Sequence, residues 1–400
     1  MTDLPRHHAF LPYPDRQVAS ASSGPLAGLT MAVKDIFDVA GYPTGAGNAY
    51  ELARSGVKTA TAGIVQTLLD AGASFVGKSY TDELAYSLLG QNVHFGCSAN
   101  PAFPGFITGG SSSGSAVAVA AGLADIGLGT DTSGSIRIPA ALTGTIGWRP
   151  TRGMLSLDRC RALAPSFDTA GFIVRDLDAL ARLMDIFGAA ASIQPIQLCL
   201  AREMLEATDD EVVADCRTSL QKSGLQVETG ELLKGFDLTE LAEAFQTILR
   251  VEAWRSNAEL LEERPEAIDP AIRERLAAGP TISMSRLEAA RDLQRDLAVY
   301  LDTQLRDGRV YAFPTLPTTP PRVPALGEEA SLFRQRVIAL TCVAGLAGLP
   351  QLSLPLGRQS PTQAISLLAG KGLDRSLLVA AKGLIGGEHR RGESAGGARS

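Results

Sequence analysis

The sequence predicts an α/β protein, in which strands and helices alternate along the chain. Hydrophobic residues make up 45% of its 400 residues and charged residues 20%, a balance that allows a large buried core. Segments with the apolar spacing of strands alternate with segments of helical spacing. Residues 95–148 carry only three charges, on Asp125, Asp131 and Arg137, and so long an uncharged stretch is typical of buried structure.

The predicted elements follow this alternation from the N-terminus. A strand over residues 29–39 (LTMAVKDIFDV) precedes a helix over 59–72, whose apolar residues share one face and which stops at Gly72. The elements predicted after it are a strand at 73–77, a small-residue helix at 115–123, and strands at 126–129, 310–313 and 352–354.

The second half of the chain differs in composition from the first. Residues 201–300 contain 33 charged residues, which predicts an exposed helical layer, with helices at 239–261 and 284–306. We expect one domain over residues 1–386, with its core block at 25–180. The polar, glycine-rich segment 387–400 is expected to be a disordered tail.

Composition excludes several classes of partner. The net charge of −6 leaves no excess of Lys and Arg to neutralise phosphates, so no nucleic-acid partner is expected. The five cysteines are scattered and contain no CxxC pair, which argues against a disulfide framework or a metal site and favours a reducing compartment. No apolar run reaches the roughly 20 residues of a membrane-spanning helix, and the first residues show no secretory pattern. We therefore expect a soluble, cytoplasmic protein.

One motif suggests nucleotide binding but has the wrong context. Gly72–Ser79 (GASFVGKS) matches the phosphate-binding pattern G-x-x-x-x-G-K-[ST]. That loop works only between a strand and a helix, where backbone N–H groups face the phosphates. Here the segment follows a helix, and its middle favours extended structure. We predict that Lys78 is a strand-end lysine and that the segment binds no nucleotide.

The residues that carry chemistry lie in Gly109–Pro139 (GGSSSGSAVAVAAGLADIGLGTDTSGSIRIP). Taken alone, residues 109–115 are typical of a flexible loop, but they lie in the uncharged stretch and lead into an apolar helix. A second Ser/Gly turn, at 132–135, follows a predicted strand. Because Gly lets a substrate and backbone amides approach closely, two such turns in a buried setting favour a nucleophilic serine.

A nucleophilic serine needs a base within hydrogen-bond reach. Only one of the four histidines, His94, lies away from the chain ends, and its context is more typical of a structural loop histidine. A lysine can act instead where burial lowers its pKa. Lys34 is the best candidate, because strand alternation puts Ala32 and Ile36 beside it on an apolar face.

The 109–139 block resembles the central consensus of the amidase-signature family, with its GGSS start and its GTD-x-GGS-I-R-x-P end. Further segments similar to that family are Val33–Asp35, Asp82–Ala85, Gly147–Thr151, Ser166–Gly171, Pro314–Pro317 and Gly348–Gly357. The resemblance extends over roughly residues 25–385. It implies a single large amidase-signature domain with a mixed central β-sheet covered by helices on both faces. It also implies an amidase that needs no metal or organic cofactor.

The resemblance implies a catalytic triad on three matching positions. Ser135 matches the nucleophile, and Lys34 matches the base. Ser111 matches the bridging serine, which in this family follows a cis peptide bond; here that bond would join Gly110 to Ser111. The separation between the two serines, 135 − 111 = 24 residues, agrees with the spacing of the family.

The same resemblance implies the groups around the nucleophile. The backbone N–H groups expected to form an oxyanion hole are those of Thr132, Ser133, Gly134 and Ser135. Asp131 and Arg137 match a supporting ion pair. The chain has Ser133 where the family usually has Gly, and a serine costs strain there if the backbone needs a positive φ.

The resemblance narrows the substrate to small carboxylic amides. Segments around Lys34 and Asp82–Ser87 are similar to plant-type indole-3-acetamide hydrolases, which suggests arylacetamides converted to an acid and ammonia. A glutamine-hydrolysing subunit of an amidotransferase complex and a non-catalytic, amidase-like binding protein are the alternatives. The sequence allows a homodimer but does not require one.

Overall fold

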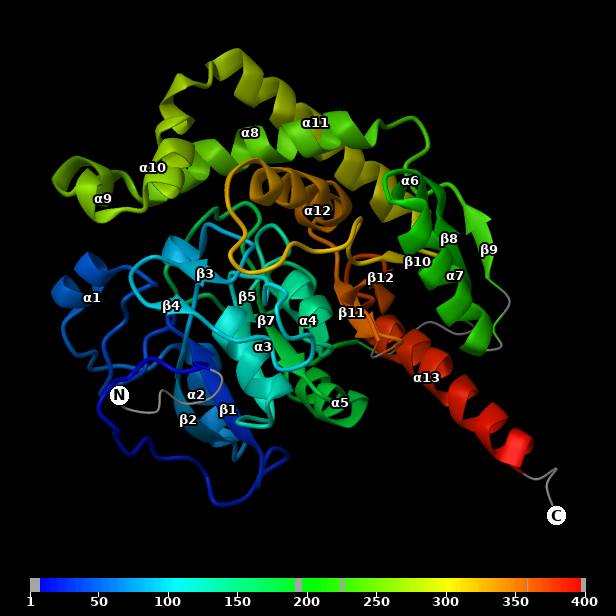
Figure 1. Ribbon diagram of the computed structural model, residues 1–400, viewed down its shortest axis with the longest axis horizontal. Coiled ribbons are helices and arrows are strands. Elements are labelled where there is room, and N and C mark those ends of the chain that lie inside the picture. The colour runs from blue at the N-terminus through cyan, green and yellow to red at the C-terminus, as the bar shows by residue number, and fades with distance from the viewer. Residues whose placement is uncertain (1–7, 191–195, 224, 226, 358, 397–400) are drawn as a thin grey trace.

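The computed structural model describes residues 8–190, 196–223, 225, 227–357 and 359–396. Within these ranges a mixed β-sheet runs through the molecule (Figure 1). Its strands, in order across the sheet, are β2 (Ser74–Ser79), β1 (Thr30–Lys34), β5 (Ile126–Thr130), β7 (Ala170–Val174), β6 (Ile146–Arg149), β11 (Gln351–Pro355), β12 (Ala364–Leu368), β10 (Val310–Pro314), β8 (Leu198–Ala201) and β9 (Glu228–Gly230). A separate hairpin joins β3 (Gln91–Asn92) to β4 (Gly96–Cys97).

Strand direction changes across this sheet. β1 pairs in parallel with both β2 and β5, whereas β5, β7, β6, β11, β12 and β10 form successive antiparallel pairs. β8 then pairs in parallel with β10 and with β9. The three strands β2, β1 and β5 therefore present their carboxyl ends at one edge.

Helices cover both faces of the sheet. One face packs against α2 (Gly63–Asp70), α5 (Leu177–Ile186), α7 (Asp210–Ser223) and α13 (Asp374–Gly396). The other packs against α3 (Ser113–Ala120), α4 (Arg137–Leu142) and α12 (Gly327–Ala347). Strand alternation divides these contacts: in β1, Met31 and Val33 join the core with α2, while Ala32 packs against α3. The predicted fold, a mixed sheet with helices on both faces, is confirmed.

An outer helical layer lies over α12 (Figure 1). It consists of α8 (Leu238–Ser256), α9 (Ala258–Glu263), α10 (Pro270–Ala277) and α11 (Met284–Gln304), while α1 (Ala49–Ser55) and α6 (Arg202–Glu206) are short peripheral helices. The sequence predicts this layer, but α8 is less exposed than expected, because Leu241, Phe245 and Ile248 are buried in the core.

Two predicted segments differ in the structure. The strand expected over residues 29–39 ends at Lys34, because the backbone turns there: the N–H groups of Ile36 and Phe37 donate to the Lys34 carbonyl. The segment 387–400, expected to be disordered, continues helix α13 as far as Gly396, and residues 397–400 lie outside the described residues. That helix begins on the buried, helically spaced residues Leu377, Ala381 and Leu384.

Helix α12 passes through the middle of the core. Among the described helices it is the one that is long and apolar enough to cross a membrane, but 67% of its apolar window is buried inside the structure. Burial of this kind is typical of the central helix of a globular domain.

Candidate active site

The candidate site lies at the carboxyl ends of the parallel strands. Lys34 is the last residue of β1, and Thr130 is the last residue of β5. The Lys34 Nζ donates one hydrogen bond to the Ser111 Oγ, at 2.8 Å, and another to the Thr130 Oγ1, at 2.9 Å. In open α/β sheets, ligands bind outside the carboxyl ends of the strands, and this edge carries the predicted base and one of the two predicted serines.

Lys34 is a buried amine held by hydroxyl groups rather than by a carboxylate. Its side chain is fully buried, and it takes part in no salt bridge in the described part of the chain. Burial lowers the pKa of Lys34 to about 8, against the opposing charges of Asp82 and Asp131. A large share of these amines is therefore neutral slightly above physiological pH, as a lysine base requires.

The position of Ser111 is fixed by a close approach between its own loop and the segment of Asp82. The Gly110–Ser111 peptide bond is cis, as the resemblance implies. A side chain at Gly110 would collide with the Asp82 carboxylate, so only glycine fits there. The Asp82 N–H donates to the Ser111 carbonyl, and its carboxylate accepts from the backbone N–H groups of Leu89 and Gly90.

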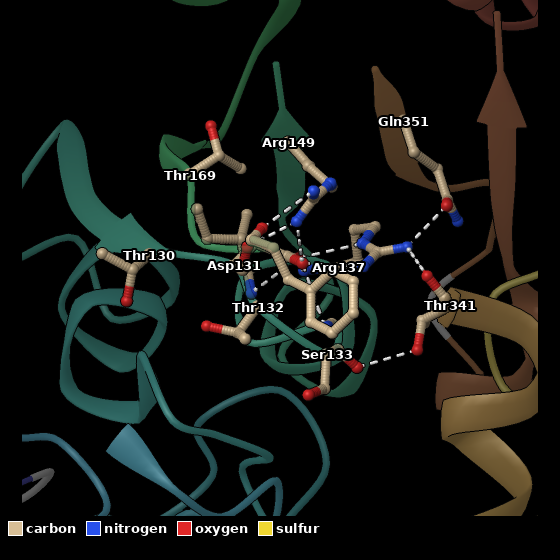
Figure 2. Close-up of polar contacts among 12 residues, drawn as sticks. Thr130, Asp131, Thr132, Ser133, Arg137, Arg149, Thr169, Thr341 and Gln351 are labelled. Carbon is tan, nitrogen blue, oxygen red and sulfur yellow. Dashed lines mark hydrogen bonds and ion pairs between the residues drawn. The ribbon is translucent and has the colours of Figure 1, made fainter. Parts of the chain in front are cut away.

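Asp131 organises the turn that carries Ser135 (Figure 2). Its carboxylate accepts from the N–H groups of Gly134 and Ile136, at 3.0 and 3.1 Å. Two guanidinium groups also contact it, that of Arg137 at 2.7 Å and that of Arg149 at 3.0 Å, and all three side chains are fully buried. Although burial raises the pKa of the Asp131 carboxyl, the charge and hydrogen bonds of Arg137 and the charge of Arg149 lower it below its usual range. The carboxylate stays ionised and fixes the turn.

The predicted oxyanion-hole amides are not equivalent. The Gly134 N–H donates to Asp131, so this amide is already engaged, in contrast to the expectation. The N–H groups of Thr132, Ser133 and Ser135 make no hydrogen bond within the described residues. Three of the four expected donors are thus left to bind a ligand.

The serine that replaces the usual glycine sits without backbone strain. Ser133 is not among the residues with positive φ, whereas Gly134 has φ 114°. The Ser133 carbonyl accepts a hydrogen bond of 2.7 Å from the Thr341 Oγ1 of α12 (Figure 2). The conformational requirement for glycine therefore falls on Gly134, and the expected strain at Ser133 is absent.

Ser135 lines a pocket that is partly open to solvent and has about 460 Å³ of empty space. The Ser135 carbonyl accepts from the Ser112 N–H, which ties the turn of Ser135 to the loop of Ser111. No direct hydrogen bond joins the Ser111 and Ser135 hydroxyls in the described structure. The apolar side chains in the pocket wall are Ala85, Leu88, Leu163, Leu249 and Ile338, together with Tyr86.

The two competing sequence signals prove to be structural. His94 contacts Glu83, with 2.7 Å between the His94 Nε2 and the Glu83 Oε1, and neither predicted serine. Lys78 lies in β2, fully buried, and pairs with Asp35 at 3.0 Å. The Gly72–Ser79 segment is therefore a helix end and a strand, without the strand–loop–helix order that phosphate binding needs.

Several residues of the site could not be identified individually from the sequence. Arg149 lies in one of the family-like motifs, but nothing in the motif pairs it with Asp131. The Arg137 guanidinium also donates to the Thr341 carbonyl and to the Gln351 Oε1 (Figure 2), more than 200 residues away in sequence. Without an indication of which distant segments meet, single-sequence reasoning has no signal for such pairs.

Comparison with known proteins agrees with this geometry. A family model described as Amidase matches residues 11–207. Two plant proteins named Amidase 1 are similar along most of their length: that of Oryza sativa is 35% identical over 88% of this chain and 89% of its own, and that of Arabidopsis thaliana is 36% identical over 90% and 93%. This chain belongs to the amidase family.

Other relatives widen the range of activities inside the amidase family. A solved structure described as an amidase superposes with a TM-score of 0.80 at 30% identity, covering 91% of this chain and 85% of the other. A glutamyl-tRNA(Gln) amidotransferase subunit of Haloarcula marismortui is 30% identical over 86% of this chain and 91% of its own. The predictions of an amidase enzyme and of a likeness to plant-type amidases are confirmed.

The Asp131 network yields a test of what holds the site together. Asp131→Asn leaves two buried guanidinium groups without their counter-charge, so we expect it to lower the free energy of unfolding by about 3–5 kcal/mol and to abolish amide hydrolysis. Denaturant unfolding and an activity assay measure both effects. Asp302→Asn is the control, because its ion pair with Arg306 is exposed and should contribute at most about 1 kcal/mol. Equal losses in the two variants would contradict this account.

Proposed function

We propose that the protein hydrolyses small carboxylic amides through an acyl-enzyme on Ser135, with Lys34 and Ser111 as its proton relay. Neutral Lys34 takes a proton from the Ser111 Oγ, which takes a proton from the Ser135 Oγ as that oxygen attacks the amide carbonyl. The Lys34–Ser111 hydrogen bond of 2.8 Å supports this order most directly. Ser111 then gives its proton to the leaving nitrogen and regains one from the Lys34 ammonium, the C–N bond breaks, and ammonia departs.

Water completes the reaction by the reverse relay. As it attacks the acyl carbon it loses a proton to Ser111, whose own proton passes to Lys34. The bond to Ser135 then breaks as Ser111 protonates the Ser135 Oγ, Lys34 returns its proton to Ser111, and the carboxylic acid leaves. The tetrahedral oxyanion in each half-reaction would be held by the free N–H groups of Thr132, Ser133 and Ser135. Removing one such donor in other enzymes costs roughly 3 kcal/mol of transition-state stabilisation.

Arylacetamides such as indole-3-acetamide are the first substrates to test. The apolar side chains around the pocket and the likeness to plant proteins named Amidase 1 support this choice. We place the enzyme in the cytoplasm, in keeping with five cysteines that form no disulfide. An ammonia-release screen over indole-3-acetamide, phenylacetamide, aliphatic amides and glutamine tests the substrate, and size-exclusion chromatography tests for a homodimer.

A glutamine-hydrolysing subunit of an amidotransferase is the second candidate. The similarity to the amidotransferase subunit of Haloarcula marismortui favours it. Such a protein needs a partner to use the ammonia, so glutamine hydrolysis stimulated by a co-purifying protein would support it. A non-catalytic binding protein, the third alternative, is disfavoured because Lys34, Ser111 and Ser135 are all retained.

The nucleophile assignment predicts the behaviour of Ser135→Ala. This variant lacks the attacking oxygen, so turnover should fall by a factor of about 10⁴ or more while the melting temperature stays near that of the wild type. Ser113→Ala, at the first residue of helix α3, is the matched control because it removes another buried serine hydroxyl near the site, and it should lose less than about tenfold. Retention of activity in Ser135→Ala, measured by ammonia release, would refute the mechanism.

The lowered pKa of Lys34 predicts the pH profile. Since the neutral amine is the base, kcat/KM for an uncharged amide should rise about tenfold per pH unit below pH 8 and level off above it. Lys34→Met should remove activity at every pH, whereas Lys382→Gln, a substitution of an exposed lysine, should leave the profile unchanged. A flat profile between pH 6 and 9 would show that Lys34 is not the base.

A further inference from the structure

The pocket of Ser135 contains three arginines from three different helices. Arg250 comes from α8, Arg275 from α10 and Arg334 from α12. None of the residues that line this pocket is acidic. The three side chains also line a larger groove next to the pocket, so they lie between that groove and the catalytic serine.

The charges of these arginines are unmatched in the described structure. None of the three forms a salt bridge there, and their hydrogen bonds go to neutral groups: Arg275 donates to the Tyr86 carbonyl at 2.8 Å, and Arg250 donates to the Gln246 Oε1 at 3.2 Å. Arg334 makes no hydrogen bond in the part of the chain that is described, and the Nε atoms of Arg275 and Arg334 are buried without a partner.

Other buried arginines of the same protein do have a carboxylate partner. Arg137 and Arg149 share the Asp131 carboxylate, and Arg161 pairs with Glu51 at 2.6 Å. Partly buried like charges repel and cost free energy unless an anion joins them. Burial, followed by the charge of Arg275, lowers the pKa of Arg334 to about 10, which agrees with a cluster that lacks its counter-ion.

Acidic residues near the cluster do not supply that counter-ion. Glu83, Asp269 and Glu274 line the adjoining groove, and Asp269 and Glu274 act on Arg275 through their charges. None of them forms a salt bridge with Arg250, Arg275 or Arg334 in the described structure, and Glu83 contacts His94 instead. The free N–H groups of the cluster therefore remain available to a bound molecule.

We propose that the amide substrate carries a carboxylate, which Arg250, Arg275 and Arg334 bind while the amide lies at Ser135. This inference rests on the proposed function and specifies its substrate class as ω-amides of dicarboxylic acids, such as succinamate and glutaramate. A guanidinium group suits this task, because its planar N–H groups match a carboxylate in two parallel hydrogen bonds. Free glutamine fits less well, since no acidic residue lines the pocket to pair with its ammonium group.

The test compares a charged amide with its neutral isostere. Ammonia release gives kcat/KM for succinamate and for 4-methylpentanamide, whose branched end has the shape of a carboxylate. The wild type should prefer succinamate by about 10- to 100-fold, the range expected for hydrogen bonds to a charged group. Arg334→Gln should remove most of this preference through KM, with a loss on succinamate about tenfold or more larger than the loss on 4-methylpentanamide. Arg255→Gln, an exposed position on α8, is the control.

Binding to the Ser135→Ala protein, measured by calorimetry, separates the two proposals. We expect succinamate to bind this variant about tenfold or more tighter than 4-methylpentanamide, and to lose this advantage when Arg334→Gln is added. That result supports the arginine site even if the wild type hydrolyses neither amide. Absence of hydrolysis would then refute the proposed function alone. Equal binding of both amides, equal rates on both, or an equal loss on both in Arg334→Gln would overturn the carboxylate proposal. Arylacetamide hydrolysis without any gain from a carboxylate would overturn it and leave the amidase mechanism standing.

Discussion

The site depends on one buried carboxylate, which interacts both with charged side chains and with backbone N–H groups. Asp131 accepts from two guanidinium groups and from amides of the turn that follows it (Figure 2). An ionised group in a dry interior is costly unless its partners satisfy it fully, and here the partners include the chain segment that carries Ser135. The shape of the turn is thus a consequence of satisfying this charge. The amides of Thr132, Ser133 and Ser135, which Asp131 does not bind, are the ones proposed to hold an oxyanion.

Buried cations are stabilised in three different ways in this protein. Lys78 pairs with Asp35 and remains part of the structure. Lys34 lies on the neighbouring strand, with hydroxyl groups in place of a directly bound carboxylate, so burial lowers its pKa even against the more distant charges of Asp82 and Asp131. The pocket arginines keep their charge but lack a counter-ion in the described residues. The nature of the partner, more than burial itself, separates the structural cation from the proposed base and from the proposed anion site.

Much of this fold and site can be predicted from the sequence, because burial and local structure depend strongly on residues that are neighbours in the chain. The small, uncharged residues of 109–139 indicate two buried serine turns, and the apolar neighbours of Lys34 single out that lysine. The features that the sequence cannot predict depend on contacts between residues far apart in the chain. Asp82 limits position 110 to glycine, Thr341 holds the Ser133 carbonyl, and three helices from the charged second half bring the pocket arginines together. In sequence those arginines look like the exposed face of ordinary amphipathic helices.

Helix α12 couples the two ends of the pocket. Arg334 and Ile338 line it, and Thr341 lies one further turn along, bound to the Ser133 carbonyl. Spacings of four and three residues place all three on one face of the helix. Because the helix is rigid and mostly buried, these three positions have little freedom to move independently of one another. An anion bound by Arg334 would therefore contact the same helix that holds the turn of Ser135, so that the proposed carboxylate site and the proposed nucleophile share one helix.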